Sequence, residues 1–289
     1  MGDRFVSGFT IVRNAVRFDL PIEAALRSIS PLCDEIVVNV GDSEDETLEI
    51  VRSIDDPKIR VLESVWGDPA AMSNVLHSIE TNRALDACRH PWCFYVQADE
   101  VLHEDDVPRV RAALERHGED ARVEALVFDY LHFYGSFDWV GVGRRWYRRE
   151  VRLVRKASGI RSVGGAQGFR VAGRKPRAAP SGARIFHYGW SKRPEKVIEK
   201  RRLWQRYRGL PGDPAAQADL YRNLPELRRF QGSHPRVMRD WIAARNWDFD
   251  PRDYSRDRGW GELKLIVSDA IERVTGWRPF EHRNFRWAR

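Results

Sequence analysis

Short apolar runs alternate along this chain with stretches in which apolar residues recur every three or four positions. The runs predict buried strands, and the spaced positions predict helices with one apolar face. We predict strands at residues 5–12, 35–40, 59–62, 92–96 and 124–130, and helices at residues 20–29, 47–54, 73–87 and 105–117. Strands and helices that alternate in this way form βαβ units, so we predict an α/β fold with a mostly parallel sheet.

The regular alternation ends after residue 130. Residues 133–163 are rich in aromatic residues, glycine and arginine, and residues 164–182 have the composition of a loop. A short strand is predicted at 185–188. Three further helices are predicted, at 194–207, 235–247 and 261–274. We therefore expect a core of residues 1–190 followed by a helical C-terminal extension of residues 191–289.

The composition is that of a soluble folded protein, with 42% hydrophobic and 31% charged residues in 289. Its apolar runs are much shorter than the roughly 20 residues of a membrane helix. The N-terminus does not resemble a signal peptide, so we expect a cytoplasmic protein. The three cysteines lack CxxC spacing, which favours buried free thiols over disulfides or a zinc site.

The chain carries a formal net charge of +7, and its basic residues are densest between residues 144 and 208. A nucleotide diphosphate, an anionic membrane surface or a nucleic acid would each complement this charge. The alternative is a solvated basic face that binds no partner. The basic residues do not form a recognisable nucleic-acid module, so we expect no nucleic-acid partner.

Polar side chains follow the first, second and fourth predicted strands directly. Because the carboxyl ends of parallel strands lie along one edge of a sheet, these side chains should converge on one cleft. They are Arg13, Asn14, Asp42, Ser43, Asp45, Asp99 and Glu100. The alternatives are that the residues around Ser43 cap the next helix and that Arg13 is a surface residue.

Asp99 is the candidate metal ligand, since a carboxylate at this edge can hold a divalent cation against a diphosphate. His187 lies in a short apolar strand, where a neutral imidazole is either a second metal ligand or a core residue. The first strand is not followed by a GxGxxG or GxxxxGK[ST] loop, and no GxSxG elbow is present. Metal and basic side chains would therefore have to bind the phosphates.

Several of these segments together resemble the family-2 glycosyltransferases, whose GT-A fold is a Rossmann-like, mostly parallel sheet flanked by helices. The segments are Thr10-Ile11-Val12-Arg13-Asn14, Asp34-Glu35-Ile36-Val37-Val38, residues 41–47 (GDSEDET), Asn82-Arg83-Ala84-Leu85, Gln97-Ala98-Asp99-Glu100 and residues 186–190 (FHYGW). Gln97 to Glu100 stands where the family has its D-x-D motif. The late histidine segment, with Lys200 downstream, is similar to that of one bacterial branch.

The resemblance implies transfer of a sugar from a nucleotide-diphosphate donor to an acceptor hydroxyl, with inversion at the anomeric carbon. It implies that Asp99 and His187 bind Mg²⁺ or Mn²⁺. The residues implied for the nucleotide and its phosphates are Arg13, Asn14, Asp42, Asp45, Asn82, Gln97, Lys192, Arg193 and Lys200. By family analogy, the reaction belongs to cell-surface polysaccharide or glycolipid assembly.

Two residues depart from the family pattern. Gln97 replaces the first aspartate of the D-x-D motif and brings no charge, which predicts a lower metal affinity. Val40 replaces an aspartate that helps to read the nucleotide base. These departures leave a non-catalytic sugar-nucleotide binder as an alternative function. A sugar-nucleotide pyrophosphorylase is a second alternative, although it should carry a glycine-rich loop after the first strand.

An inverting enzyme needs a carboxylate base to deprotonate the acceptor hydroxyl. The candidates are Asp138, Glu150 and Glu100. We hypothesise that Asp138 is the base, because it lies in an aromatic stretch, residues 133–139, that suits stacking on a sugar ring. The alternative is that Asp138 is a solvated loop carboxylate.

The C-terminal extension carries several tryptophans among many arginines. Such a surface either packs onto the core or lies on an anionic membrane near a lipid-linked acceptor. We therefore expect a sugar or lipid-linked acceptor, and peripheral contact with the inner face of the membrane remains open.

Overall fold

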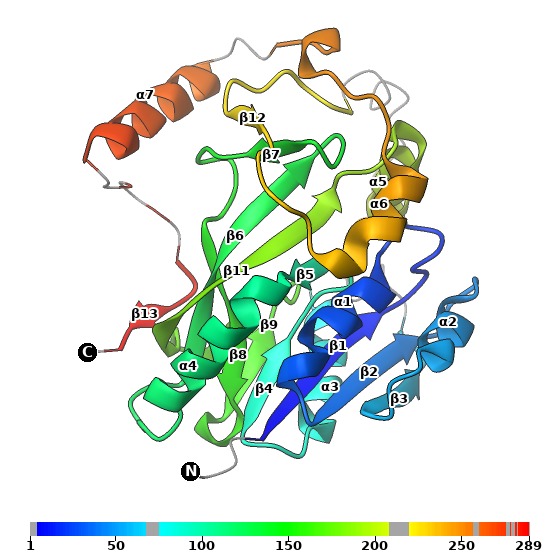
Figure 1. The fold of residues 1–289 in the computed structure, drawn as a ribbon, viewed down its shortest axis with the longest axis vertical. Coiled ribbons are helices and arrows are strands. Elements are labelled where there is room, and N and C mark those ends of the chain that lie inside the picture. The colour runs from blue at the N-terminus through cyan, green and yellow to red at the C-terminus, as the bar shows by residue number, and fades with distance from the viewer. Residues whose placement is uncertain are drawn as a thin grey trace.

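The computed structural model describes residues 5–67, 75–207, 220–256, 260–275, 278, 281 and 283–288. One curled, 11-stranded sheet runs through these residues, with helices on both of its faces (Figure 1). A separate two-stranded hairpin packs beside it. The predicted α/β class is confirmed.

The N-terminal half of the sheet is parallel. It contains β1 (Val6–Val12), β2 (Glu35–Gly41), β3 (Ile59–Ser64) and β4 (Trp92–Tyr95), in the order β4-β1-β2-β3. All residues of β1, β2 and β4 are buried, because both faces of a parallel sheet are covered. These strands confirm the prediction to within two residues at each end.

Two apolar layers sandwich this half of the sheet. On one face, α1 (Ile22–Ile29), α2 (Thr47–Ser53) and α4 (Val107–His117) share a core with β1, β2 and β4. On the other face, α3 (Leu76–Ala87) packs with Phe9 and Tyr95. The four helices of the predicted alternation are therefore present.

The second half of the sheet is largely antiparallel. It contains β6 (Ala125–Tyr134), β7 (Trp139–Gly141) and β8 (Arg149–Arg155), and β8 joins it to β4. The short strand β5 (Glu100–Leu102) pairs with β11 (Arg177–Trp190). β11 also runs parallel to β6. Nothing in the sequence alternation beyond residue 130 indicated these long-range pairings.

The loop predicted at residues 164–182 is wrong, and the strand predicted at 185–188 is confirmed but is only part of a longer strand. β9 (Ile160–Val163) and β10 (Gly168–Val171) form the separate hairpin, and β11 is 14 residues long. The glycines, prolines and basic residues of residues 164–182 are typical of a loop. Pro180 and Gly182 nevertheless lie within β11, where the register against β6 shifts between Pro180 and Arg184. Ala179 and Ala183 of the same strand are buried in the core that contains α4.

The C-terminal extension contains the three predicted helices. They are α5 (Pro194–Tyr207), α6 (Arg239–Arg245) and α7 (Trp260–Thr275). The extension also adds strands to the sheet, since β12 (Leu227–Arg229) pairs with β7 and β13 (Arg286–Trp287) pairs with β11. The boundary at residue 190 stays a prediction.

Aromatic residues of the extension pack against the core. Trp247 joins a buried cluster with Tyr134 and Trp146, and Trp241 packs beside Phe133. The side chains of Trp204 and Trp260, and the whole of Trp277, lie outside the described part of the structure. Within the described residues, no helix combines the length and the apolar character that crossing a membrane requires.

Cys33, Cys88 and Cys93 are all buried and free, as the sequence predicted. Burial raises the pKa of the Cys33 thiol. A hydrogen bond with Cys93, together with burial, raises the pKa of the Cys88 thiol. Both of these thiols therefore stay protonated at neutral pH.

Candidate active site

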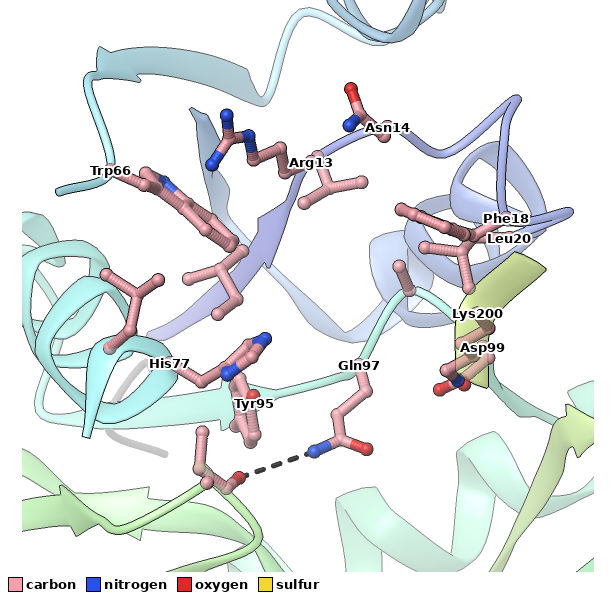
Figure 2. Close-up of a pocket in the computed structure, with 16 residues that line it drawn as sticks. Arg13, Asn14, Phe18, Leu20, Trp66, His77, Tyr95, Gln97, Asp99 and Lys200 are labelled. Carbon is pink, nitrogen blue, oxygen red and sulfur yellow. Dashed lines mark hydrogen bonds between the residues drawn. The ribbon is translucent and has the colours of Figure 1, made fainter. Parts of the chain in front are cut away.

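A cavity of about 250 Å³ opens at the carboxyl ends of β1 and β4 (Figure 2). This is the sheet edge where the predicted polar residues were expected to converge. Its walls come from the end of β1 and the β1–α1 segment, Trp66 two residues after β3, the start of α3, the end of β4 and the segment after it, the β9–β10 turn and α5. The polar and aromatic residues among them are Arg13, Asn14, Phe18, Trp66, His77, Tyr95, Gln97, Asp99 and Lys200.

The two ends of this pocket differ in chemistry. Figure 2 shows Trp66 and His77 on one side, and Asp99 with Lys200 on the other. Trp66 and His77 contact each other edge to face, with ring centroids 5.8 Å apart. Burial, and then the charge of Lys200, lower the pKa of His77, so this side of the pocket is aromatic and neutral. We call the two sides the aromatic end and the charged end.

Gly41, at the end of β2, sets the position of the aromatic end. A Cβ atom at this position would lie 2.7 Å from the indole nitrogen of Trp66. The Trp66 indole N–H donates to the Ser64 hydroxyl at 3.1 Å, and its backbone N–H donates to Asp42 Oδ1 at 3.1 Å. The indole therefore lies flat against the backbone of β2.

The β1–α1 loop forms the upper wall. Arg13 donates to the backbone carbonyl and the carboxylate of Asp42, at 3.2 and 3.3 Å. Asn14 has a left-handed backbone with φ 55°, and its side-chain oxygen accepts the Glu44 N–H at 2.8 Å. Both residues line the pocket and also fix the loop after β2.

Five of the residues predicted to bind the nucleotide or its phosphates do not line the pocket: Asp42, Asp45, Asn82, Lys192 and Arg193. Asp45 accepts the backbone N–H groups of Arg17 and Thr47, and Asn82 makes two hydrogen bonds with the Ser162 backbone.

Lys192 is buried. Its ammonium donates to the carbonyls of Phe18 and Asp19. Burial and the neighbouring Lys200 lower the pKa of Lys192 to about 7. Their contacts within the chain give Asp42, Asp45, Asn82 and Lys192 structural roles, and their nucleotide role stays a prediction.

Asp99 lies at the charged end, directly after Ala98 in the turn that follows β4. Its Oδ1 is 3.8 Å from Nε2 of His187 on β11. Burial alone would raise the pKa of Asp99, but His187, Lys200 and Lys192 outweigh it and lower the pKa below its usual range. Burial lowers the pKa of His187 more than Asp99 raises it. The pair is therefore a carboxylate that faces a neutral imidazole.

The space between these two side chains depends on Gly189. A Cβ atom on Gly189 would lie 2.7 Å from His187 Nε2 and 2.8 Å from Asp99 Oδ2. The oxygen and nitrogen donors suit a divalent cation, and the glycine leaves room for one. Among the described residues, no group of three or more His, Cys, Asp or Glu side chains could hold a metal. A cation here would therefore complete its coordination with water or with a bound molecule.

Glu100 anchors the turn that presents Asp99. It forms a buried ion pair with Arg152, with two contacts of 2.8 Å, and both side chains are 0% exposed. The Tyr130 hydroxyl and the Gln97 N–H donate to the same carboxylate, at 2.8 and 3.1 Å. Because these donors occupy both of its oxygens, Glu100 does not serve as the candidate base.

The other two candidate bases lie outside the residues that line the pocket. Glu150 is buried on β8. Asp138 is half-buried and accepts a hydrogen bond from the side chain of Asn246 at 3.2 Å. Phe133 and Phe137 are buried in a core with β11 and α6 and do not offer a stacking surface. Trp139, which adjoins Asp138, is half-buried, so the sugar-stacking role of this stretch stays a prediction.

His132 is a residue of this site that the sequence analysis missed. Its Nδ1 is 3.0 Å from Nδ1 of His187, and its Nε2 is 2.8 Å from the carbonyl oxygen of Tyr147. Trp66, His77 and Tyr95 were missed as well. The local sequence around His132 shows no metal-ligand spacing; only the β6–β11 pairing, which places His132 opposite His187, reveals the contact.

The mixed sheet flanked by helices, with an acidic turn after β4 at the pocket, agrees with the GT-A fold that the sequence resemblance implied. The family model described as "Glycosyl transferase family 2" matches residues 21–172, more than half of the chain. The chain therefore belongs to glycosyl transferase family 2.

Similar solved structures include residues 1–349 of S. aureus TarS, at 15% identity and a TM-score of 0.41, over 75% of this chain and 69% of that one. Another is glucosyl-3-phosphoglycerate synthase from Mycobacterium tuberculosis, in complex with Mn²⁺, UDP and glucosyl-3-phosphoglycerate. It shows 19% identity and a TM-score of 0.33, over 46% of each chain. No curated protein matches the chain.

Proposed function

We propose that this protein is an inverting, metal-dependent glycosyltransferase that moves a sugar from a nucleotide-diphosphate donor to an acceptor hydroxyl. The observation that carries the proposal is the division of one pocket into an aromatic end and a charged end. A sugar nucleotide has the same division, with a planar base at one end and a diphosphate at the other. Membership of glycosyl transferase family 2 supports the same class of reaction.

The aromatic end is the proposed base site. Trp66, His77 and Tyr95 offer apolar ring surface on which a planar base can pack. Arg13 and Asn14, on the adjoining wall, supply hydrogen-bond donors for the base or ribose. The base would therefore bind between α3 and the end of β1.

The charged end is the proposed diphosphate site. Asp99 and His187 would hold Mg²⁺ or Mn²⁺, and Lys200 would neutralise the phosphates. When bound, such a cation offsets the negative charge that develops on the leaving diphosphate. Gln97 brings no charge to this end, so metal affinity depends strongly on Asp99. We assign the chain to a bacterial branch with this QADE variant of the motif.

Asp138 remains our candidate for the base that takes the proton of the acceptor hydroxyl. Glu100 is committed to Arg152, and Glu150 is 1% exposed, whereas Asp138 keeps access to solvent. Asp138→Asn should lower kcat for transfer by at least about 100-fold, within the range of general-base effects, and leave donor binding unchanged. If the variant transfers sugar at nearly the wild-type rate, Asp138 is not the base.

The test of the proposed function is thermal stability with UDP, GDP, CMP or dTDP, each with and without Mn²⁺. A ligand that binds only the folded state raises the melting temperature, by the equivalent of about 2.7 kcal/mol at 100 times its Kd. We expect one nucleotide to stabilise the protein only with Mn²⁺, and Asp99→Asn to lose this effect. No shift with any pair would contradict the proposal.

Product analysis separates the enzyme from a non-catalytic binder. An inverting transferase should release the nucleoside diphosphate from the matching sugar nucleotide. The sugar in the product should have the anomeric configuration opposite to that in the donor. Binding without any release would support a sugar-nucleotide binder. Formation of a sugar 1-phosphate and a nucleoside triphosphate from donor and pyrophosphate would indicate a pyrophosphorylase.

For the acceptor, we propose a sugar or lipid-linked hydroxyl used in cell-surface polysaccharide or glycolipid assembly. Family analogy supports this class of acceptor. Co-sedimentation of the full chain with vesicles that contain anionic lipid tests the peripheral membrane contact. Equal amounts of protein in the pellet with neutral and anionic vesicles would argue against an electrostatic contact.

A further inference from the structure

His132 and His187 form a chain of two hydrogen bonds whose directions can be worked out. The carbonyl oxygen of Tyr147 can only accept, so Nε2 of His132, 2.8 Å away, carries the proton. A neutral His132 then has its lone pair on Nδ1. The atom 3.0 Å from this lone pair is Nδ1 of His187, which must therefore carry a proton and donate it.

The direction of these bonds fixes which nitrogen of His187 is bare. With the proton on Nδ1, neutral His187 has its lone pair on Nε2. That lone pair faces Asp99 Oδ1 at 3.8 Å, which is too long for a hydrogen bond. Two electron-rich atoms thus face each other across the space that Gly189 leaves open. A cation between them satisfies both.

The reverse direction is unfavourable. It would place the proton of His187 on Nε2 and the proton of His132 on Nδ1, leaving Nε2 of His132 without a hydrogen. A nitrogen lone pair would then face the Tyr147 carbonyl at 2.8 Å, and two acceptors at that distance repel each other. A doubly protonated His132 is also unfavourable, because the residue is 2% exposed and a buried charge is costly.

The ring of His132 is fixed by its neighbours. Tyr130 stacks on it with ring centroids 5.4 Å apart, and Tyr147 contacts it edge to face at 4.5 Å. His132 on β6 lies directly opposite His187 on β11 in the parallel register. Both the position and the tautomer of His187 therefore depend on a residue that does not reach the pocket.

We propose that His132 is a positioning residue that holds His187 in the tautomer whose bare Nε2 points towards Asp99, ready to bind a divalent cation. This inference rests on the metal site of the proposed function. Metal-bound histidines commonly donate their other N–H to a fixed acceptor, and loss of that acceptor typically costs 10- to 100-fold in metal affinity. In this chain, the fixed acceptor is a second histidine, oriented by a backbone carbonyl.

The first test is made on the metal-free wild-type protein. Nitrogen-15 NMR of the histidine side chains distinguishes a ring protonated on Nδ1 from one protonated on Nε2. We expect His187 to carry its proton on Nδ1 and His132 to carry its proton on Nε2. A proton on Nε2 of His187 would overturn the proposal, whether or not the protein is active.

The second test uses a matched pair of variants. His132→Asn keeps an acceptor near the position of Nδ1, whereas His132→Phe keeps an aromatic ring without one. We expect His132→Phe to weaken the binding of Mn²⁺ alone by 10- to 100-fold, measured from the electron paramagnetic resonance of free Mn²⁺. His132→Asn should stay within about threefold of wild type.

The outcomes separate this inference from the proposed function. If the wild type binds Mn²⁺ and Asp99→Asn does not, but His132→Phe binds it normally, the metal site stands and the role of His132 is refuted. Absence of Mn²⁺ binding by the wild type would overturn both. Equal loss in the two His132 variants would also overturn the tautomer argument, since His132→Asn retains the acceptor. The wild-type NMR result decides the tautomer even if a variant fails to fold.

Discussion

Glu150 makes the folded protein less stable as the pH rises. Its side chain is 1% exposed, its Oε1 accepts a hydrogen bond from Asn284 at 2.9 Å, and its Oε2 has no hydrogen-bond partner among the described residues. Burial raises its pKa from 4.5 to about 7, more than Arg152 and Asn284 lower it. In the folded state, ionisation of this carboxyl is therefore unfavourable.

The size of the effect follows from the shift in pKa. In the unfolded chain Glu150 ionises near pH 4.5, whereas in the folded chain it keeps its proton until about pH 7. The folded state thus binds more protons between these values, and the free energy of unfolding falls as the pH rises through them. A shift of this size corresponds to about 3 kcal/mol, reached near pH 8.

Glu150→Gln removes this titration and keeps the shape of the side chain. We expect the variant to resemble wild type near pH 5 and to be more stable by up to about 3 kcal/mol at pH 8. For a chain of this length, that is a rise in melting temperature of roughly 5 °C. Urea unfolding from pH 5 to pH 8.5 measures the difference. A constant difference across this range would refute the reasoning.

Glu124 provides a control, because its pKa is shifted in the opposite direction to that of Glu150. Hydrogen bonds from Arg174, together with contacts to Arg177, lower its pKa from 4.5 to about 2. Its contribution to stability is complete above pH 4.5 and is lost only as the pH falls towards 2. Glu124→Gln should therefore destabilise the protein equally at pH 5 and pH 8.

Three further predictions concern the pocket and its support. Arg152→Met leaves the Glu100 carboxylate buried without its charged partner, so the free energy of unfolding in urea should fall by about 3–5 kcal/mol. Adding Glu100→Gln to the same chain should partly restore this free energy. Gly189→Ala places a methyl group 2.8 Å from Asp99 Oδ2, and calorimetry should show Mn²⁺ affinity reduced by about tenfold or more. Lys200→Ala removes the cation of the charged end; calorimetry should show roughly tenfold weaker binding of the nucleoside diphosphate but unchanged binding of the nucleoside. Wild-type values in the last two experiments would exclude Gly189 and Lys200 from the site.

The sequence predicts those parts of the fold that depend on neighbouring residues. β1 and β2 are rich in apolar residues because helices cover both of their faces, and this burial is visible in the composition alone. The position of Asp99 follows from the same logic, since the carboxyl ends of parallel strands share one edge. The charged end of the pocket was therefore within reach of sequence reasoning.

The contacts between strands that are distant in the sequence could not be predicted from the sequence. β11 was underestimated because Pro180 and Gly182, residue types typical of turns, lie within it. Without the full length of β11 there is no register against β6, and without that register His132 and His187 have no reason to meet. The wrong strand length and the missed histidine thus have one cause.

Polar residues next to the site misled the prediction for a different reason. Asp45 and Asn82 have the residue types and positions of nucleotide ligands, yet backbone N–H and C=O groups already occupy their polar atoms. A sequence shows which side chains carry oxygen or nitrogen. It does not show which of them are already satisfied by the loops of the fold itself.

The three buried thiols make this chain well suited to site-specific labelling. Because Cys33, Cys88 and Cys93 are enclosed by the core, maleimide reagents should leave them unmodified in the folded protein. A single cysteine introduced at an exposed position, such as Val142 or Val267, would then be the one reactive thiol. A fluorophore or spin label could be attached there without first removing the native cysteines and disturbing the core that they help to fill.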